Sequence, residues 1–263
     1  MYAEYPHHSR STGGAMMRAP DAVAAAKISS TRVRLSTLIA KVTPFQADRS
    51  CYFLWMRLTV QTFLTLDGVM QAPGGPDEDP SDGFSHGGWQ APFEDPAVGD
   101  FVMELNSHAS AFLFGRRTFD IFRGHWPDQT DPDNAIAVAI NSLPKHVVSE
   151  SLDDTDVSWR NQHPDTAHLV AGDVVTAVRT LKQEPGDELQ VWGSGRLLGT
   201  LLQHGLVDRF RLMTFPVVLG SGRRLFNAHV QPSTMRVVDL TVTEHGIVLG
   251  TYEPAGPARH GQM

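Results

Sequence analysis

The order of strand and helix patterns constrains the fold of this chain more than any other feature of its sequence. Short apolar runs typical of buried strands alternate with stretches whose apolar residues recur every three to four positions, as in helices. The strand patterns lie at residues 57–64, 111–114, 146–149 and 189–192. The helical patterns lie at 98–109, 116–120, 134–142, 173–183 and 197–203. Alternating strands and helices predict a parallel sheet with helices on both of its faces.

The C-terminal part follows a different pattern. Three strand patterns, at 207–214, 234–243 and 246–252, follow one another without helices between them. Consecutive strands predict an antiparallel edge, which many mixed sheets carry. We therefore expect one α/β domain over residues 56–254, with three layers (α/β/α), a mostly parallel central sheet and an antiparallel C-terminal edge. Residues 255–263 are expected to form a flexible tail.

Residues 1–55 differ in charge from the rest of the chain. They carry seven Lys or Arg residues and three Asp or Glu residues, although the whole chain has a net charge of −7. Three interpretations compete: a disordered extension, a basic targeting peptide, and upstream sequence read from a misassigned start. The last is favoured because Met56 directly precedes the first strand pattern.

Composition argues against several classes of function. Cys51 is the only cysteine, which excludes an intramolecular disulfide and a cysteine-rich zinc site and fits a reducing, cytoplasmic compartment. The acidic balance argues against a nucleic-acid partner. No apolar run approaches the roughly 20 residues of a membrane span, so no membrane association is expected. The twelve histidines show no metal-binding spacing, so no metal is expected.

Two junctions between a strand and a helix combine glycine, a hydroxyl group and arginine. They read Gly115-Arg116-Arg117-Thr118 and Gly193-Ser194-Gly195-Arg196. At such a junction the free N–H groups and the positive end of the helix dipole favour a phosphate, and arginine offers it a bidentate partner. Either turn alone is more typical of an ordinary loop. The two together predict a bound dinucleotide, with one turn for each phosphate group.

Two loops are further candidates for a functional site. The segment from Asp67 to Pro96 is rich in glycine and proline and is too long for an idle connection, so it is a candidate active-site loop. Two interpretations fit the segment Gly220-Ser221-Gly222-Arg223-Arg224 equally well. It is either a subsite for an anionic group of a substrate or a turn with solvated arginines.

Four segments, in order along the chain, are similar to motifs of a known family. They are Leu64-Thr65-Leu66-Asp67-Gly68-Val69, Gly115-Arg116-Arg117-Thr118-Phe119-Asp120, Val191-Trp192-Gly193-Ser194-Gly195-Arg196-Leu197, and the run from Phe215 to Phe226. With them, the chain resembles the dihydrofolate-reductase-like superfamily. It is more closely similar to the reductase domain of the riboflavin-biosynthesis deaminase-reductase, and to the stand-alone proteins built on that domain. The resemblance implies an NADPH-dependent reductase that passes hydride to a small-molecule substrate.

The resemblance assigns the nucleotide site to the two glycine turns and to the residues after the third strand pattern. The residues expected to bind NADPH are Gly115, Arg116, Arg117, Thr118, Ser149, Ser151, Gly193, Ser194, Gly195, Arg196 and Leu197. Ser149 and Ser151 occupy the place of the adenosine 2′-phosphate. Glu150, between them, would repel that phosphate if it pointed inward.

The resemblance also places the reacting groups beneath the loop after the first strand. Asp67 and Asp100 are the expected catalytic carboxylates. Asp95 is the alternative to Asp100 as a proton relay, although an acid in the first turn of a helix more often stabilises the helix dipole. The residues expected to contact the substrate are Leu66, Gly68, Trp126, Gly220, Ser221 and Arg223.

The expected substrate is a small heterocycle, either 5-amino-6-(5-phosphoribosylamino)uracil, as in riboflavin biosynthesis, or a pterin such as dihydrofolate. Gln61 stands where the pyrimidine reductases carry a lysine, and the chain lacks the H-x-E and C-x-x-C motifs of a deaminase half. The alternative is a protein that binds a nucleotide or another ligand without turnover. Relatives often pair through the sheet edge or the C-terminal strands, so a homodimer through residues 234–252 is expected.

Overall fold

The computed structural model describes residues 55–159, 166–227 and 230–261, so the interpretations of residues 1–55 concern a segment that, except for Trp55, lies outside the described residues. The strands are β1 (Arg57–Thr65), β2 (Ala109–Gly115), β3 (Lys145–Val148), β4 (Ala167–Val170), β5 (Glu188–Trp192), β6 (Arg209–Phe215), β7 (Ser233–Val242) and β8 (Val248–Pro257). The helices are α1 (Pro96–Ser107), α2 (Arg116–His125), α3 (Ala135–Ser142), α4 (Val174–Leu181) and α5 (Gly195–Gln203).

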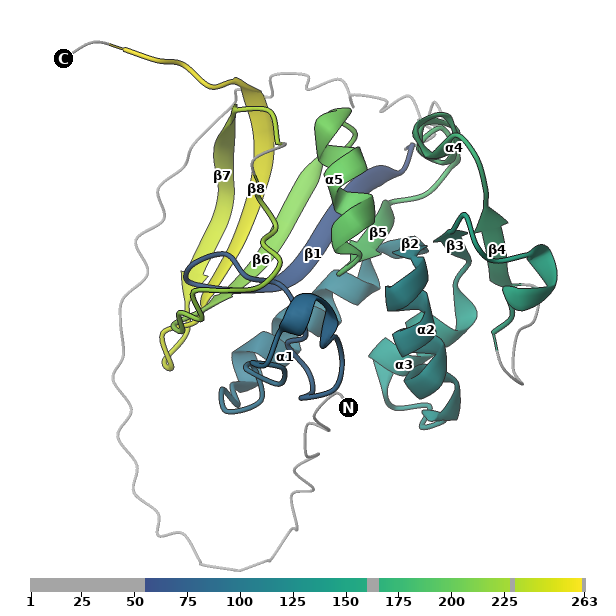
Figure 1. The fold of residues 1–263 in the computed structure, drawn as a ribbon, viewed down its shortest axis with the longest axis horizontal. Helices are drawn as coiled ribbons and strands as arrows, with labels where there is room; N and C mark the ends of the chain where they lie inside the picture. The colour runs from purple at the N-terminus through teal and green to yellow at the C-terminus, as the bar shows by residue number, and fades with distance from the viewer. Residues whose placement is uncertain (1–54, 160–165, 228–229, 262–263) are drawn as a thin grey trace, which may run out of the picture. The chain divides into compact units, whose positions relative to one another are not determined.

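The eight strands form one sheet in the order β4-β3-β2-β5-β1-β6-β8-β7, which crosses Figure 1 from right to left. The first six strands in this order pair in parallel. Strands β6, β8 and β7 pair antiparallel. The expectation of a mostly parallel α/β sheet with an antiparallel C-terminal edge is therefore confirmed.

Each face of the sheet has its own apolar cluster. On one face, α1, α2 and α3 bury residues such as Leu105, Phe119 and Ile140 against the aromatic side chains of β2. On the other face, α4 and α5 bury Val178 and Leu201 together with the leucines and valines of β1 and β5. Fully burying a side chain of this size contributes about 1.5–3 kcal/mol. These two clusters account for the three layers, with the sheet in the middle.

Most boundaries lie within a few residues of the sequence patterns, and the differences have local causes. Helix α1 begins at Pro96 because Asp95 caps it, accepting a hydrogen bond from Ala97 N at 2.9 Å. Ala109, which matched the helical spacing, is instead the first residue of β2. Strand β8 continues to Pro257, so the first residues of the predicted tail belong to the sheet.

Strand β4 is the one described strand that the sequence patterns did not indicate. Its four residues include His168, and they pair with β3 at the edge of the sheet. Such a short run with an exposed polar residue has no distinct period, so pairing with a neighbour decides its structure. In the described part of the chain, no helix has the length and apolar character needed to cross a membrane.

Candidate nucleotide-binding site

The site lies where the helices that follow two neighbouring strands leave the sheet in opposite directions. Strands β2 and β5 pair with each other, but α2 packs on one face of the sheet and α5 on the other. In open α/β sheets, ligands bind in the crevice outside the carboxyl ends of the strands at such a switch point. Both glycine–arginine turns lie at this crevice because they follow these two strands.

A cavity of about 570 Å³ occupies the crevice. It is lined by every residue that was expected to bind the nucleotide: Gly115, Arg116, Arg117, Thr118, Ser149, Ser151, Gly193, Ser194, Gly195, Arg196 and Leu197. The ends of β3 and β4 add further residues, among them Glu150 and Gly172. The predicted nucleotide residues therefore form one continuous wall, although they come from three separate segments.

The two glycine turns are joined by hydrogen bonds. Gly115 N donates to Ser194 Oγ at 3.0 Å, and Ser194 N donates to Thr118 Oγ1 at 3.0 Å. Gly193 and Ser194 both have left-handed backbone angles, with φ of 54° and 60°. A Cβ atom at position 193 would lie 3.3 Å from Thr118 Oγ1, so glycine allows the turns to approach this closely.

This pair of turns fits the pyrophosphate of a dinucleotide. The first turns of α2 and α5 both meet the cavity wall, and the first N–H groups of a helix have no partner within the helix. The hydroxyl of Ser194 donates to Trp192 O at 2.9 Å and accepts from Gly115 N, so it is engaged with the neighbouring turn. The backbone and the guanidinium groups are thus the natural donors for an anion here.

Arg116 reaches the segment after β3, where a 2′-phosphate was expected. Its Nε pairs with Asp120 at 2.6 Å, and its Nη1 donates to Ser151 Oγ at 3.2 Å. Ser149 Oγ accepts from the backbone N–H groups of Ser151 and Leu152, both at 3.2 Å. The serines and the arginine are therefore brought together, as the sequence predicted, and Glu150 shares the wall with them.

The loop after β1 supplies cavity residues that the sequence did not single out: Met70, Gln71, Ala72, Glu78 and Asp79. Glu78 Oε2 accepts hydrogen bonds from Gly74 N at 2.6 Å and Gly75 N at 3.2 Å. Burial raises the pKa of the Glu78 carboxyl, and these two bonds oppose that shift only in part. The loop was a candidate from its length and composition, but nothing in its sequence distinguished Glu78 and Asp79 from neighbouring acids.

The side chain of Asp67 is held between the turn after β1 and the segment after β6. The carboxylate accepts from Thr65 Oγ1 at 2.6 Å, from Gly220 N at 2.9 Å and from Leu219 N at 3.2 Å, and pairs with Arg224 at 3.1 Å. The hydrogen bond from Thr65 contributes most to holding its pKa well below the usual range. Asp67 is thus an ionised structural carboxylate and a poor proton donor.

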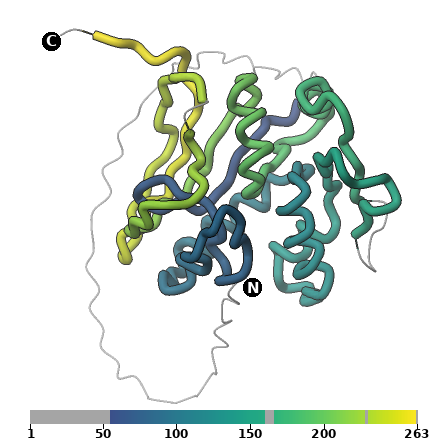
Figure 2. Tube along the Cα trace, viewed as in Figure 1, coloured from purple at the N-terminus to yellow at the C-terminus, as the bar shows by residue number. Residues whose placement is uncertain are grey.

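Leu66 and Gly68 take part in the same turn. Leu66 N donates to Val217 O at 2.8 Å, and Leu225 N donates to Gly68 O at 3.1 Å, so the turn pairs with the segment after β6. Figure 2 shows the path of the chain through both segments. The side chain of Leu66 is exposed. The cavity wall begins at Met70, because the turn at 65–69 is used for this pairing.

The second expected catalytic carboxylate, Asp100, also lies away from the cavity wall. It is exposed on α1, a helix that contributes no residue to this wall within the described part of the chain. Asp95 is buried as the cap of α1, and its Oδ2 lies 3.1 Å from His245 Nδ1. Asp95 therefore has the ordinary role of an acid that caps a helix. The proton relay expected of Asp100 or Asp95 remains a prediction.

Three of the residues expected to contact the substrate are also placed elsewhere. Trp126 is buried in the apolar cluster at the far end of α2, because a helix of ten residues carries it about 15 Å from the turn at Gly115. Gly220 and Ser221 are exposed in the turn that Asp67 holds. Of this set, Arg223 lines the cavity.

Gln61, which replaces the family's lysine, is fully buried on β1 between Trp192 of β5 and Arg211 of β6. Within the described part of the chain, neither of its amide atoms has a hydrogen-bond partner. A buried amide without partners costs free energy, so this position is held by the packing around it and contributes no ion pair.

The fold and the cavity together define an α/β protein with a candidate nucleotide-binding crevice at the switch point of its sheet. The chain belongs to the RibD C-terminal domain family, whose model matches residues 56–249. The family expected from the sequence is therefore confirmed.

Individual proteins are similar to this chain in sequence or in fold. YyaP, an uncharacterized protein of Bacillus subtilis, is 28% identical over 202 residues, which cover 74% of this chain and 94% of YyaP. A pyrimidine reductase-like protein from Corynebacterium diphtheriae superimposes with a TM-score of 0.52 at 13% identity, covering 76% of this chain and 92% of that protein. RibD from Acinetobacter baumannii superimposes with a TM-score of 0.53 at 17% identity, covering 76% of this chain and 58% of RibD.

Proposed function

We propose that this protein is an NADPH-dependent reductase of a small heterocycle, of the pyrimidine or pterin type. The observation that carries the proposal is the single cavity at the switch point, whose wall contains all the residues expected to bind the nucleotide. The family of the chain and the pyrimidine reductase-like protein of the same fold support it.

The residues of the cavity suit the parts of a reduced dinucleotide. The turns at Gly115 and Gly193 would hold the pyrophosphate, and Arg116 with Ser151 would hold the 2′-phosphate. When bound, the reduced nicotinamide supplies the hydride. Glu78, a cavity carboxyl whose pKa is raised by burial, is the residue to which we assign the proton for the substrate.

The test is a titration of the purified protein with NADPH and with NADH, followed by nicotinamide fluorescence. We expect NADPH to bind more tightly. The variant Arg116→Ala should weaken NADPH binding roughly ten-fold, because it removes a charge-assisted hydrogen-bond donor to the phosphate. Arg179→Ala, an equal loss of charge on an exposed position of α4, is the matched control and should leave the affinity unchanged. Binding of neither cofactor would refute the proposal.

A second candidate function is ligand binding without turnover. It is favoured by the positions of Asp67 and Asp100, since neither expected catalytic carboxylate lines the cavity. A screen of aminouracils, pterins and folates for oxidation of NADPH separates the two functions. Turnover that is lost in Glu78→Gln supports the reductase, whereas tight NADPH binding with no oxidation by any of these compounds supports the second function.

A further inference from the structure

The carboxylate of Asp79 lies between two arginines that the sequence assigned to different ligands. Asp79 Oδ1 accepts from Arg117 Nη1 at 2.5 Å, and Oδ2 accepts from Arg223 Nη1 at 2.9 Å. The Asp79 side chain is only 8% exposed, whereas Arg117 and Arg223 both reach the cavity. One buried acid therefore joins the cofactor side of the site to the substrate side.

Ser81 completes this arrangement. Its hydroxyl donates to Asp79 Oδ1 at 2.5 Å and accepts from Arg117 Nη1 at 2.8 Å and from Arg223 Nη2 at 3.0 Å. Burial alone would raise the pKa of the Asp79 carboxyl, but the bonds from Ser81 and the two arginines outweigh burial and lower it. Asp79 thus stays ionised, and both of its oxygens are engaged.

The backbone around Arg223 is fixed as well. Arg223 N donates to Gln71 Oε1 at 2.9 Å, and Gln71 Nε2 donates to Asp79 O at 3.1 Å. A Cβ atom on Gly195 would lie 2.6 Å from Arg223 Cδ, so the stem of this arginine rests directly on the second glycine turn. Arg223 is therefore held against the first residue of α5, beside the place suited to a pyrophosphate.

We propose that Asp79 is a positioning residue that holds Arg117 and Arg223 together as one cationic subsite for a phosphate group of the bound nucleotide. This inference rests on the function proposed above. Two neighbouring guanidinium groups repel each other and lose side-chain freedom when a ligand orders them. A carboxylate fixed between the two guanidinium groups offsets their repulsion and orders their side chains before the ligand binds. The three groups together keep one net positive charge.

Removing the charge of Asp79 distinguishes a positioning role from a purely electrostatic effect on anion binding. In Asp79→Asn the site becomes more positive, so charge alone predicts tighter binding of an anion. Positioning predicts the opposite: NADPH should bind roughly ten-fold more weakly, the loss expected when a charge-assisted contact is no longer preorganised. An unchanged or tighter dissociation constant, measured by nicotinamide fluorescence, would overturn the inference.

Asp82→Asn is the matched control, because it removes the same charge from the same loop. The Asp82 side chain is 85% exposed and approaches Arg223 Nη2 no closer than 3.4 Å. The Asp82→Asn protein should therefore bind NADPH with an affinity within two-fold of the wild type. Thermal unfolding of each variant shows whether it is folded. If Asp79→Asn does not fold, Ser81→Ala decides, since it removes the hydroxyl between the arginines without a change in charge and should weaken NADPH binding several-fold.

A double-mutant cycle shows whether Asp79 acts through the arginine. In the Arg117→Ala background, Asp79→Asn should cost clearly less affinity than it does in the wild type, and equal losses in both backgrounds would contradict the proposal. If the wild-type protein binds neither NADPH nor NADH, the proposed function itself fails. If it binds NADPH and Asp79→Asn binds it equally well, only the positioning role fails.

Discussion

Asp67 follows the first strand, as the family motif requires, but its carboxylate serves the fold. It joins the turn after β1 to backbone N–H groups of Leu219 and Gly220, which lie about 150 residues further along the chain. A motif identifies such a residue through its neighbours in sequence and contains no information on partners so distant. The sequence marked Asp67 as a special position, and its contacts within the fold became visible only in the structure. The catalytic role expected of it remains a prediction.

Replacing Asp67 by asparagine should destabilise the protein. The amide keeps the size of the side chain, but one of the two oxygens that accept the backbone N–H groups of Leu219 and Gly220 becomes an NH2 donor. The charge that pairs with Arg224 is also lost. We expect the free energy of unfolding to fall by roughly 2 kcal/mol, measured by urea denaturation. Asp100→Asn, on the exposed side of α1, should change it by less than about 0.5 kcal/mol. An Asp67→Asn protein of full stability that has lost its reductase activity would restore a catalytic role for this residue.

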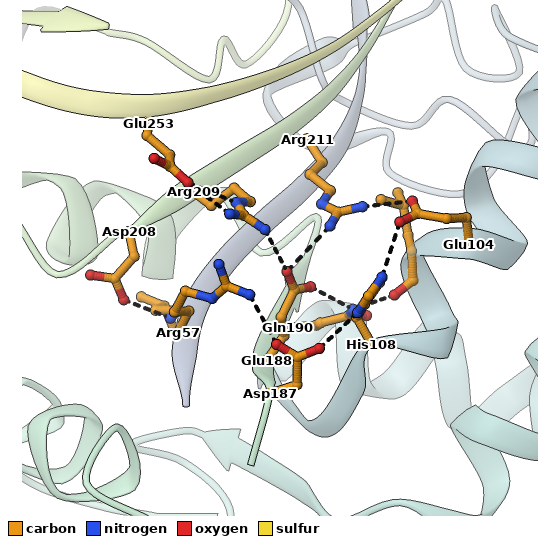
Figure 3. Close-up of polar contacts among 12 residues, drawn as sticks. Arg57, Glu104, His108, Asp187, Glu188, Gln190, Asp208, Arg209, Arg211 and Glu253 are labelled. Atoms are coloured by element: carbon orange, nitrogen blue, oxygen red, sulfur yellow. Dashed lines mark hydrogen bonds and ion pairs between the residues drawn. The ribbon is translucent and has the colours of Figure 1, made fainter. Parts of the chain in front are cut away.

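A network of buried and half-buried ion pairs joins several elements at the amino ends of the parallel strands, away from the cavity at their carboxyl ends. Figure 3 shows this network. Glu188, fully buried at the start of β5, lies 3.5 Å from both Arg209 and Arg211. Arg211 continues to Glu104 of α1 at 2.6 Å, and Arg209 continues to Glu253 of β8 at 2.7 Å. These contacts fix the register of α1 and β8 against the amino ends of the parallel strands.

The sequence predicted these elements but not this network. Arg209-Phe210-Arg211-Leu212 alternates in the way that is typical of a strand with one solvated face. Arg211 is nevertheless buried, because α1 covers that face and supplies Glu104 as its partner. Alternation predicts which side chains share a face, whereas the element that will cover the face is decided by tertiary packing.

Glu188→Gln should be strongly destabilising, because it leaves two largely buried arginines without their shared negative charge. Removing one partner of a buried ion pair typically costs about 3–5 kcal/mol, and we expect a loss of this order in urea or thermal unfolding. Glu244→Gln, the same change on an exposed glutamate of the turn between β7 and β8, serves as the control and should be nearly neutral. Equal stability of the two variants would show that the network contributes little beyond packing.

For the whole molecule, the sequence predicted the architecture and the nucleotide wall better than the substrate side. The nucleotide residues follow strands that are neighbours in a parallel sheet, so local motifs and the order of elements suffice to bring them together. The substrate side depends on the long loop after β1, whose path is set by contacts with the segment after β6. Loop paths of this kind follow no sequence period, which explains why Gln71, Glu78 and Asp79 were missed.

The outer strand of the sheet bears on the expected homodimer. Val237, Leu240 and Val242 of β7 are 54%, 51% and 62% exposed. They pair with Tyr252, Gly250 and Val248 of β8, so they share one face of the sheet despite the register shift in this ladder. An edge strand with several exposed apolar residues is a site for association with another chain.

We therefore expect the protein to form a homodimer through β7, with a mass twice that of the 28.9-kDa chain by light scattering coupled to size exclusion. Leu240→Lys should shift it to the monomer, because a charged side chain in the middle of the apolar face would lose its hydration on association. Val218→Lys places the same charge on an exposed position outside β7 and should leave the dimer intact. A monomeric wild type would contradict the expectation. A dimer that survives Leu240→Lys would place the interface on another surface and leave the apolar face of β7 to a different partner.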